Sequence, residues 1–277
     1  MHLIQAVLMG IVQGLSEFLP ISSSAHLVFT SNLYKVINNI ETTHQQTGQE
    51  VFTDIMLHLG TLIAVLIYFR KDIWVIIKAL LNGFRNKNYS YEFKLGIYII
   101  IGTFISVIVA FPLSKIAEKL VFLPQVVGIL LFFTGILLIT SEYISKKIIN
   151  KNNITLKNSI LMAIAQGLAA LPGFSRSGLT IATGLLSGME RTIAAKYSFL
   201  LSIPIILGAS MVYPFIELNL NEILTYNWVA IIIGTLVSGI VGYLCIKYFM
   251  KFLSRFSLTI FGYYCTIIGI LAIIFFK

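Results

Sequence analysis

The chain has 277 residues, of which 57% are hydrophobic and only 11% are charged, and its formal net charge is +9. A soluble domain has about 25% charged residues, so this composition excludes an ordinary soluble protein. The basic residues lie in short segments between long apolar runs, as in membrane proteins, which argues against a nucleic-acid partner. We therefore expect a single integral membrane domain over residues 1–277.

Two segments are too interrupted to be simple membrane-spanning helices. Residues 3–34 and 155–190 each consist of two short apolar pieces separated by Pro, Gly and Ser. An irregular backbone at membrane depth must be buried in protein or line a watery cavity. Each segment is therefore expected to form a re-entrant helical hairpin that enters and leaves by the same face of the membrane.

Six other stretches have about 20 apolar residues, the length that crosses a bilayer as a helix. Each predicted hairpin is followed by three of them, and three is an odd number. The second half of the chain, about 151–277, should therefore be inverted relative to the first, about 1–150. The expected fold is an all-α polytopic membrane protein with an inverted-topology repeat, a plan that places a binding site near the midplane. The six predicted spans are 52–69, 93–112, 122–141, 193–213, 228–250 and 256–276.

The two hairpin segments also resemble each other in sequence. Without gaps, residues 13–15 (QGL) align with 166–168 (QGL), Ser22 with Ser175, and Ser23 with Arg176. The polar turns of the two hairpins are therefore expected to face one another.

The distribution of basic residues predicts the orientation. Most of the 20 Lys and Arg residues fall in the segments 70–92, 142–158, 190–192 and 250–255 or at the adjoining helix ends. The N-terminal side of the predicted bundle has only Lys35, Lys115, Lys119 and Lys277. Because basic residues favour the cytoplasmic side, both termini should lie outside, with the first hairpin open to the outside and the second to the cytoplasm.

The first polar turn, within QGLSEFLPISSSAHL, contains Glu17. A carboxylate at membrane depth costs about 2.5–3.5 kcal/mol on insertion scales, so it usually has a partner and a function. Gln13 precedes it by one helical turn and could share its ligand. Ser23 and His26 are three residues apart, so on a helix His26 could act as acid or base beside a Ser23 nucleophile. The alternatives are a glutamate wetted from outside and serines, including Ser22, that only cap the helix.

The second polar turn, LPGFSRSGLT, lies at residues 171–180 and predicts an anion site. Pro172 and Gly173 break the helix, and the first amides of the next helix can bind phosphate. Arg176 adds a bidentate cationic group, and Thr180 follows it by one turn. The alternative is that Arg176 is only a structural counter-charge to Glu17.

The two turns together fit hydrolysis of a phosphate ester or anhydride at the end of a lipid. Gln13 and Glu17, with substrate phosphates, could hold Mg²⁺ or Ca²⁺, which accept few protein ligands. The other function class compatible with inverted repeats is a secondary transporter or lipid flippase. His58, at the outer start of a predicted span, is interpreted as a packing or groove-lining residue.

Both turns resemble the signature motifs of the undecaprenyl-diphosphate phosphatase family, also called the bacitracin-resistance family. QGLSEFLPISSSAH matches its first motif and LPGFSRSGLT its second, and HLGTLIAVLIYFR and KYSFLLSIPIILGAS extend the similarity to nearly the whole chain. Many members have Glu where Gln13 stands here. The matching motif residues are Gln13, Glu17, Pro20, Ser22, Ser23, His26, Pro172, Gly173, Ser175, Arg176, Ser177 and Thr180.

The resemblance implies hydrolysis of the terminal phosphate of undecaprenyl diphosphate, which recycles the lipid carrier for cell-wall synthesis and confers bacitracin resistance. It implies a place in the bacterial plasma membrane, with the active site open to the extracytoplasmic side. The expected partners are a polyprenyl diphosphate lipid and the bilayer, and a homodimer is left open. The residues expected to be catalytic are Glu17, Ser23, His26 and Arg176, and those expected to bind substrate are Gln13, Ser22, Ser175, Ser177 and Thr180.

Overall fold

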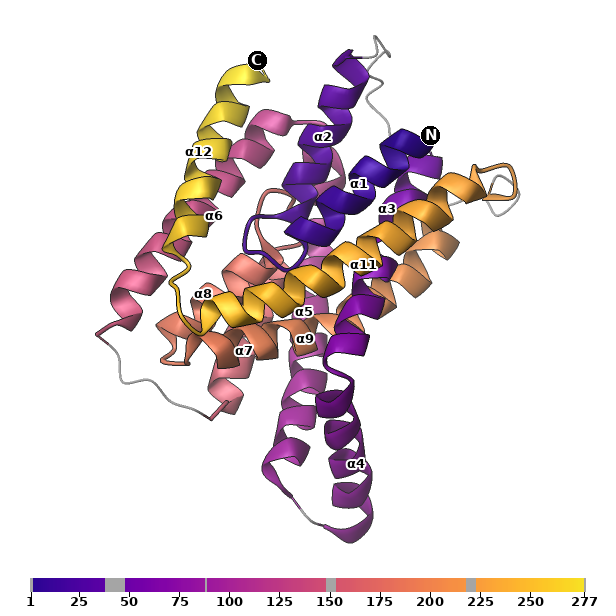
Figure 1. Ribbon diagram of the computed structural model, residues 1–277. Coiled ribbons are helices and arrows are strands. Elements are labelled where there is room, and N and C mark those ends of the chain that lie inside the picture. The colour runs from indigo at the N-terminus through magenta and orange to yellow at the C-terminus, as the bar shows by residue number, and fades with distance from the viewer. Residues whose placement is uncertain (1, 38–47, 88, 148–152, 218–222, 277) are drawn as a thin grey trace.

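The structure is a computed structural model that describes residues 2–37, 48–87, 89–147, 153–217 and 223–276. The regular elements in this part of the chain are helices, and no strand occurs among them (Figure 1). The expectation of an all-α fold is confirmed. In order, the helices are α1 (Leu3–Ser16), α2 (Ser23–Ile37), α3 (Gly48–Tyr68), α4 (Arg70–Asn86), α5 (Tyr91–Leu120), α6 (Pro124–Ser145), α7 (Leu156–Leu168), α8 (Arg176–Leu186), α9 (Arg191–Glu217), α11 (Trp228–Leu253) and α12 (Thr259–Phe275).

Five of these helices are long and apolar enough to cross a bilayer: α3, α5, α6, α9 and α11. The sixth predicted span, 256–276, is shorter than expected, because α12 has 17 residues and a length of about 26 Å. Its start is displaced to Thr259 by a turn in which the Leu258 amide donates to Glu142 Oε1 at 2.8 Å. Five long apolar helices make the chain a multi-pass membrane protein.

The segment 70–92 was expected only to connect two spans, but most of it forms α4. This helix packs antiparallel to the beginning of α5, where Gly83 lies against the ring of Phe93 and Leu80 against Gly96. Figure 1 shows the two helices projecting together from the rest of the bundle.

Two pairs of short helices, α1–α2 and α7–α8, flank the polar turns. α1 ends at Ser16, and Pro20 lies in the turn that follows it. In each pair a serine caps the second helix: the Ala25 amide donates to Ser22 Oγ at 3.3 Å, and the Gly178 amide to Ser175 Oγ at 3.0 Å. Ser22 has φ of 69°, a left-handed conformation that is uncommon for a residue with a Cβ and marks a constrained turn.

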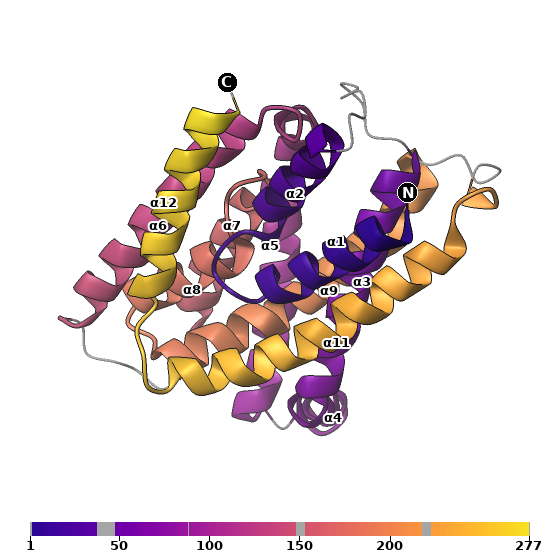
Figure 2. The ribbon, with the colours of Figure 1, turned by 45° about the horizontal axis from the view of Figure 1, so that its top comes forward.

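The helices approach each other through small residues. A Cβ on Gly10 would lie 2.5 Å from the Gly234 carbonyl oxygen, and one on Gly14 would lie 2.8 Å from that of Ser238. These contacts hold α1 directly against α11. The contact of α6 with α12 uses Gly135 in the same way, and Figure 2 shows these two helices side by side. Small residues in contact are the usual way in which membrane helices pack closely.

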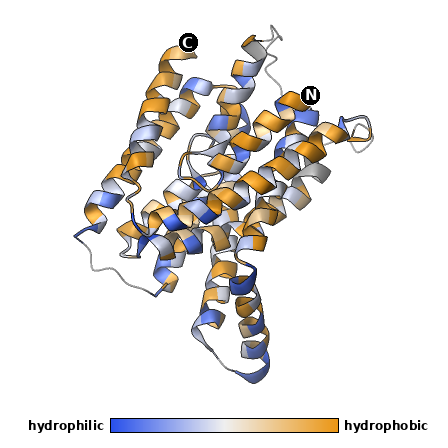
Figure 3. Cartoon of the chain, viewed as in Figure 1, coloured by the Kyte–Doolittle hydropathy of each residue, from blue (hydrophilic) through white to orange (hydrophobic). Residues whose placement is uncertain are grey.

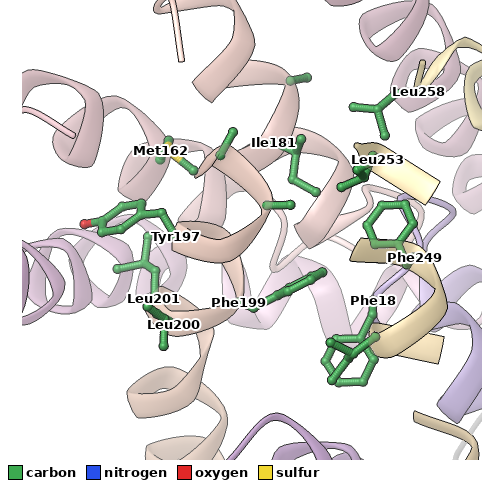
Figure 4. Packing of buried hydrophobic residues seen from close by; sticks show 14 of the residues in the cluster. Phe18, Met162, Ile181, Tyr197, Phe199, Leu200, Leu201, Phe249, Leu253 and Leu258 are labelled. Atoms are coloured by element: carbon green, nitrogen blue, oxygen red, sulfur yellow. The ribbon is translucent and has the colours of Figure 1, made fainter. Parts of the chain in front are cut away.

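The hydrophobic core includes a residue of the first polar turn. Phe18 is fully buried and packs edge to face against Phe199, with ring centroids 5.4 Å apart, and Phe199 in turn contacts Phe249 (Figure 4). Coloured by hydropathy, α11 is largely apolar along its length, whereas the projecting helix α4 carries many hydrophilic residues (Figure 3). Because Phe18 directly follows Glu17, its burial fixes the position of the carboxylate.

Candidate active site

The two polar turns meet at the centre of the bundle. Ser22 Oγ donates to the Phe174 carbonyl oxygen at 3.3 Å, and Ser177 Oγ donates to that of Leu19 at 3.0 Å. The prediction that the turns face one another is confirmed.

Glu17 has the cationic partner that its burial requires. Its Oε1 accepts a hydrogen bond from Arg176 Nη2 at 2.7 Å, and the side chains are 5% and 15% exposed. Arg176 is the first residue of α8, so the helix N-terminus and the guanidinium bring positive charge to the same place. The other guanidinium nitrogen, Nη1, is buried and has no hydrogen-bond partner in the described part of the chain. It is available to a ligand.

Three further side chains lie close to the second carboxylate oxygen, Glu17 Oε2. Gln13 Nε2 donates to it at 2.9 Å and Ser23 Oγ at 2.8 Å, and His58 Nε2 lies 3.6 Å away. His58 Nδ1 lies 2.8 Å from the Asp54 carbonyl oxygen, which can only accept, so Nδ1 is the donor in that bond and Nε2 faces Glu17. The sequence predicted His58 to be a packing or groove-lining residue, and it does line the cavity described below. Its contact with Glu17 was not predicted, because nothing in the local sequence places it opposite the first turn.

A cavity of about 270 Å³ opens beside this cluster. Its polar lining includes the carboxylate, the guanidinium and hydroxyl groups, whereas alanine, phenylalanine and isoleucine side chains form the remainder. Segments from both halves of the chain contribute to it. The lining residues are Glu17, Ser23, Ser24, His58, Ser106, Ala110, Gln166, Ala169, Ala170, Phe174, Ser175, Arg176, Ile205 and Ile206.

Gln166 and Ser106 are cavity residues that the sequence reasoning did not propose. Gln166 Nε2 donates to Ser106 Oγ at 3.2 Å and to the Leu201 carbonyl oxygen at 3.3 Å. In the alignment of the two turns Gln166 corresponds to Gln13, and that correspondence was the available signal. In the same alignment Glu17 corresponds to Ala170. The second turn therefore has a small side chain where the first has a carboxylate.

The structure does not pair His26 with Ser23, and the predicted proton transfer between them stays a prediction. His26 Nδ1 lies 2.8 Å from the Ser22 carbonyl oxygen, and its Nε2 lies 2.8 Å from the Tyr264 hydroxyl, on which the ring also stacks. The residues share a helix, but the Ser23 hydroxyl is bonded to Glu17. The ring of His26 is thus directed to α12, and it does not line the cavity.

The remaining predicted substrate residues have three different positions. Ser175 lines the cavity, and its hydroxyl lies 3.2 Å from that of Ser177. Ser22 and Ser177 hold the two turns together through the bonds described above. Thr180 does not reach the cavity, because its hydroxyl donates to the Arg176 carbonyl oxygen at 2.7 Å and lies 2.6 Å from Ser198 Oγ. The prediction that Thr180 contacts the ligand directly is therefore not supported by its position.

The predicted cation site can be compared with the oxygen atoms present. Among the described residues no group of three or more His, Cys, Asp or Glu side chains is arranged to hold a metal. Gln13 Oε1 is nevertheless buried beside the Glu17 carboxylate and has no described partner. One carboxylate and one amide oxygen fit a cation that takes most of its ligands from phosphate and water.

A buried carboxylate–guanidinium pair with hydroxyl groups, enclosed by membrane-length helices, defines a multi-pass membrane protein with a polar central site. The family described as "Bacitracin resistance protein BacA" matches residues 6–271, and the chain belongs to this family. The chain is 40% identical to a protein of Methanobrevibacter smithii, covering 98% of this chain and 96% of that protein. It is 39% identical to one of Halothermothrix orenii, covering 99% and 98%. Both relatives are named "Undecaprenyl-diphosphatase".

Proposed function

We propose that this chain hydrolyses the terminal phosphate of undecaprenyl diphosphate, giving undecaprenyl phosphate and inorganic phosphate. The observation that carries the proposal is the contact of Glu17 with Arg176 at the wall of a cavity that Ser23 and Ser175 also line. The names of the relatives supply the substrate. Recycling of the lipid carrier for cell-wall synthesis, and with it bacitracin resistance, would follow from this activity.

Arg176 would hold the transferring phosphoryl group. Its Nη1 has no described partner, and phosphate oxygens accept two parallel hydrogen bonds from a guanidinium. A bound phosphate would also compete with Glu17 for Nη2. Phosphoryl transfer depends mainly on positioning and charge stabilisation, which a fixed guanidinium at a helix N-terminus supplies.

Glu17 would then accept a proton from the attacking hydroxyl. Ser23 already donates its hydroxyl to Glu17 Oε2, so attack by Ser23 Oγ on the terminal phosphorus would transfer that proton to the carboxylate. The bond from phosphorus to the bridging oxygen breaks, and undecaprenyl phosphate leaves. Water then releases the phosphate from Ser23. In the alternative route, water attacks directly and Ser23 only orients it.

A divalent cation, if it takes part, would be held by Glu17 and Gln13. When bound, it would neutralise charge on the phosphate oxygens. The roles of Arg176 and Ser23 described above do not depend on it.

We also propose the inverted repeat expected from the sequence. Two contacts support it. α1 packs on α11 and α7 packs on α5, and these two pairs are equivalent if α1 corresponds to α7 and α5 to α11. The last helices of the two halves, α6 and α12, also pack on each other. With the basic residues in the cytoplasm, the first turn would open to the extracytoplasmic side of the plasma membrane. A transporter or flippase finds no support in the names of the relatives described above.

The test is phosphate release from undecaprenyl diphosphate by the purified protein in detergent, where transport across a membrane cannot contribute. Arg176→Ala should abolish release, whereas Arg85→Ala, which removes an exposed arginine remote from the cavity, should not. Release that is unchanged in Arg176→Ala, or absent from the unaltered protein with and without Mg²⁺ or Ca²⁺, would overturn the proposal.

A further inference from the structure

The helix α4 has an uncovered apolar face. Trp74, Ile77, Leu81 and Phe84 are 58%, 42%, 65% and 70% exposed. Their spacing of three, four and three residues places them along one side of the helix. We call these four residues the apolar stripe.

Most of the apolar stripe lies beside, not on, the face by which α4 packs on α5. That face centres on Ile76 and Gly83, which are buried, and includes Leu80 against Gly96. At one end of the stripe the Phe84 ring also packs edge to face on Phe93 of α5, with ring centroids 5.4 Å apart, whereas Trp74, Ile77 and Leu81 are exposed. Four large exposed side chains in a row indicate a surface that another component covers.

A row of basic residues runs beside the apolar stripe. Lys71, Lys78 and Arg85 are seven residues apart, so they lie along one line of the helix, and all three are exposed. No ion pair between them and an acidic side chain is found in the described part of the chain. The one acidic residue of α4, Asp72, is on another face and pairs with Lys196 at 2.5 Å. We call Lys71, Lys78 and Arg85 the basic row.

The middle of α4, which carries part of the basic row and of the apolar stripe, packs beside the start of the apolar part of α5. The apolar stretch of α5 begins at Leu95, directly after Glu92 and Lys94, and Leu80 and Gly83 of α4 contact α5 at this point. The Nζ atom of Lys78 lies 5.1 Å from the centre of the Trp74 ring. Tryptophan at the boundary with a lysine extended along it is typical of side chains at the level of lipid headgroups.

We infer that α4 binds anionic phospholipids, with the basic row on their phosphate groups and the apolar stripe among their acyl chains. A helix with an apolar side bordered by Lys and Arg binds the membrane interface through both contributions. Each basic side chain near an anionic surface favours binding by about fivefold. The observations favour lipid over a protein partner because the basic row borders the apolar stripe and Lys78 lies over the Trp74 ring, close to where α4 packs beside the start of the apolar part of α5. This inference is independent of the proposed function.

Tryptophan fluorescence tests it directly. The chain has two tryptophans, so Trp228→Phe leaves Trp74 as the only one. The full-length variant is reconstituted into two sets of vesicles of phosphatidylcholine and phosphatidylglycerol. Brominated chains, which quench tryptophan, are carried by phosphatidylcholine in one set and by phosphatidylglycerol in the other, at the same mole fraction. If the inference holds, brominated phosphatidylglycerol binds near Trp74 about fivefold more strongly than brominated phosphatidylcholine.

Charge removal provides the matched comparison. Lys71→Gln, Lys78→Gln and Arg85→Gln together should abolish the preference, whereas Lys146→Gln, Lys147→Gln and Lys251→Gln, which remove the same charge elsewhere, should preserve it. Equal quenching by the two lipids in the parent variant would overturn the inference, as would a preference that survives loss of the basic row. Absence of quenching by either lipid would also overturn it and would indicate a protein partner for the apolar stripe.

Discussion

Glu17 Oε1 lies 2.7 Å from Arg176 Nη2, although 159 residues separate the two in the sequence. This contact joins the two polar turns, and each residue would be costly to bury at membrane depth without the other. It also identifies the atoms on which the proposed chemistry depends.

Arg176→Lys should lower turnover by at least about 100-fold, the usual effect of removing one preorganised donor to a transition state. A lysine keeps the charge but cannot bond Glu17 and a phosphate through two nitrogens of one plane. Initial rates of phosphate release measure the effect, and thermal unfolding in detergent checks that the variant is folded. A folded and fully active Arg176→Lys would show that Arg176 is only a counter-charge.

Ser23→Ala should lower turnover by on the order of 10³-fold or more if Ser23 is the nucleophile. The covalent route also predicts a phosphoserine, and rapid-quench mass spectrometry should find phosphate on the peptide that contains Ser23. Ser24→Ala is the matched control, because Ser24 lines the same cavity without bonding Glu17. Near-normal hydrolysis by Ser23→Ala would exclude the covalent route.

His58 and His26 should differ in how their loss affects the protein. His58→Gln should lower turnover by about 100-fold with little change in stability, because His58 lies at the Glu17 carboxylate and can move protons there. His26→Gln should lower the melting temperature, because His26 bonds Ser22 and Tyr264. Tyr264→Phe should share that stability loss, of about 1 kcal/mol per hydrogen bond. An inactive His26→Gln beside a normal, fully stable Tyr264→Phe would instead assign direct chemistry to His26.

Arg191→Ala should destabilise the protein by about 2–3 kcal/mol, because it leaves the Glu142 carboxylate buried without its charge partner. Arg191 Nε and Nη2 donate to Glu142 at 2.8 and 2.6 Å, and Glu142 is 1% exposed. The double variant Glu142→Gln/Arg191→Gln removes both charges and should recover part of the loss. Thermal unfolding of the unaltered protein, Glu142→Gln, Arg191→Gln and the double variant gives the coupling energy, and a value near zero would contradict the prediction.

Single cysteines test the proposed orientation. In a variant with Cys245→Ala and Cys265→Ala, Gln45→Cys should react with a membrane-impermeant thiol reagent in intact cells, and Asn86→Cys only after permeabilisation. Position 45 lies outside the residues that the structure describes, and position 86 ends α4. Labelling at 86 but not at 45 would reverse the orientation.

Local patterns predicted the helical fold and the meeting of the two turns. The repeat of residues 13–15 (QGL) at 166–168, and of Ser22 at Ser175, was sufficient to place Glu17 near Arg176. α4 was missed because its apolar residues are too few for a span and its basic residues resemble a connecting segment.

The details that failed depend on side-chain directions across helices. A spacing of three residues places His26 and Ser23 on one side of α2, but it does not show that Tyr264 offers the imidazole a partner on α12. Thr180 likewise finds Ser198 on α9. His58 reaches Glu17 only because α3 packs beside α1, which no short-range pattern reveals.

The contact of α1 with α11 has a consequence for how the site tolerates change. Gly14, next to Gln13, lies against the backbone of α11 at Ser238 and Gly242 and against the Cβ atom of Val241, with no side chain of its own between them. The distance from α11 to the carboxylate of Glu17 is thus set by main-chain atoms, which are the same whatever amino acids occupy the outer surface of α11. Exposed residues of α11 such as Leu236 and Ile240 can therefore differ between relatives in different membranes without changing the position of the Glu17 carboxylate.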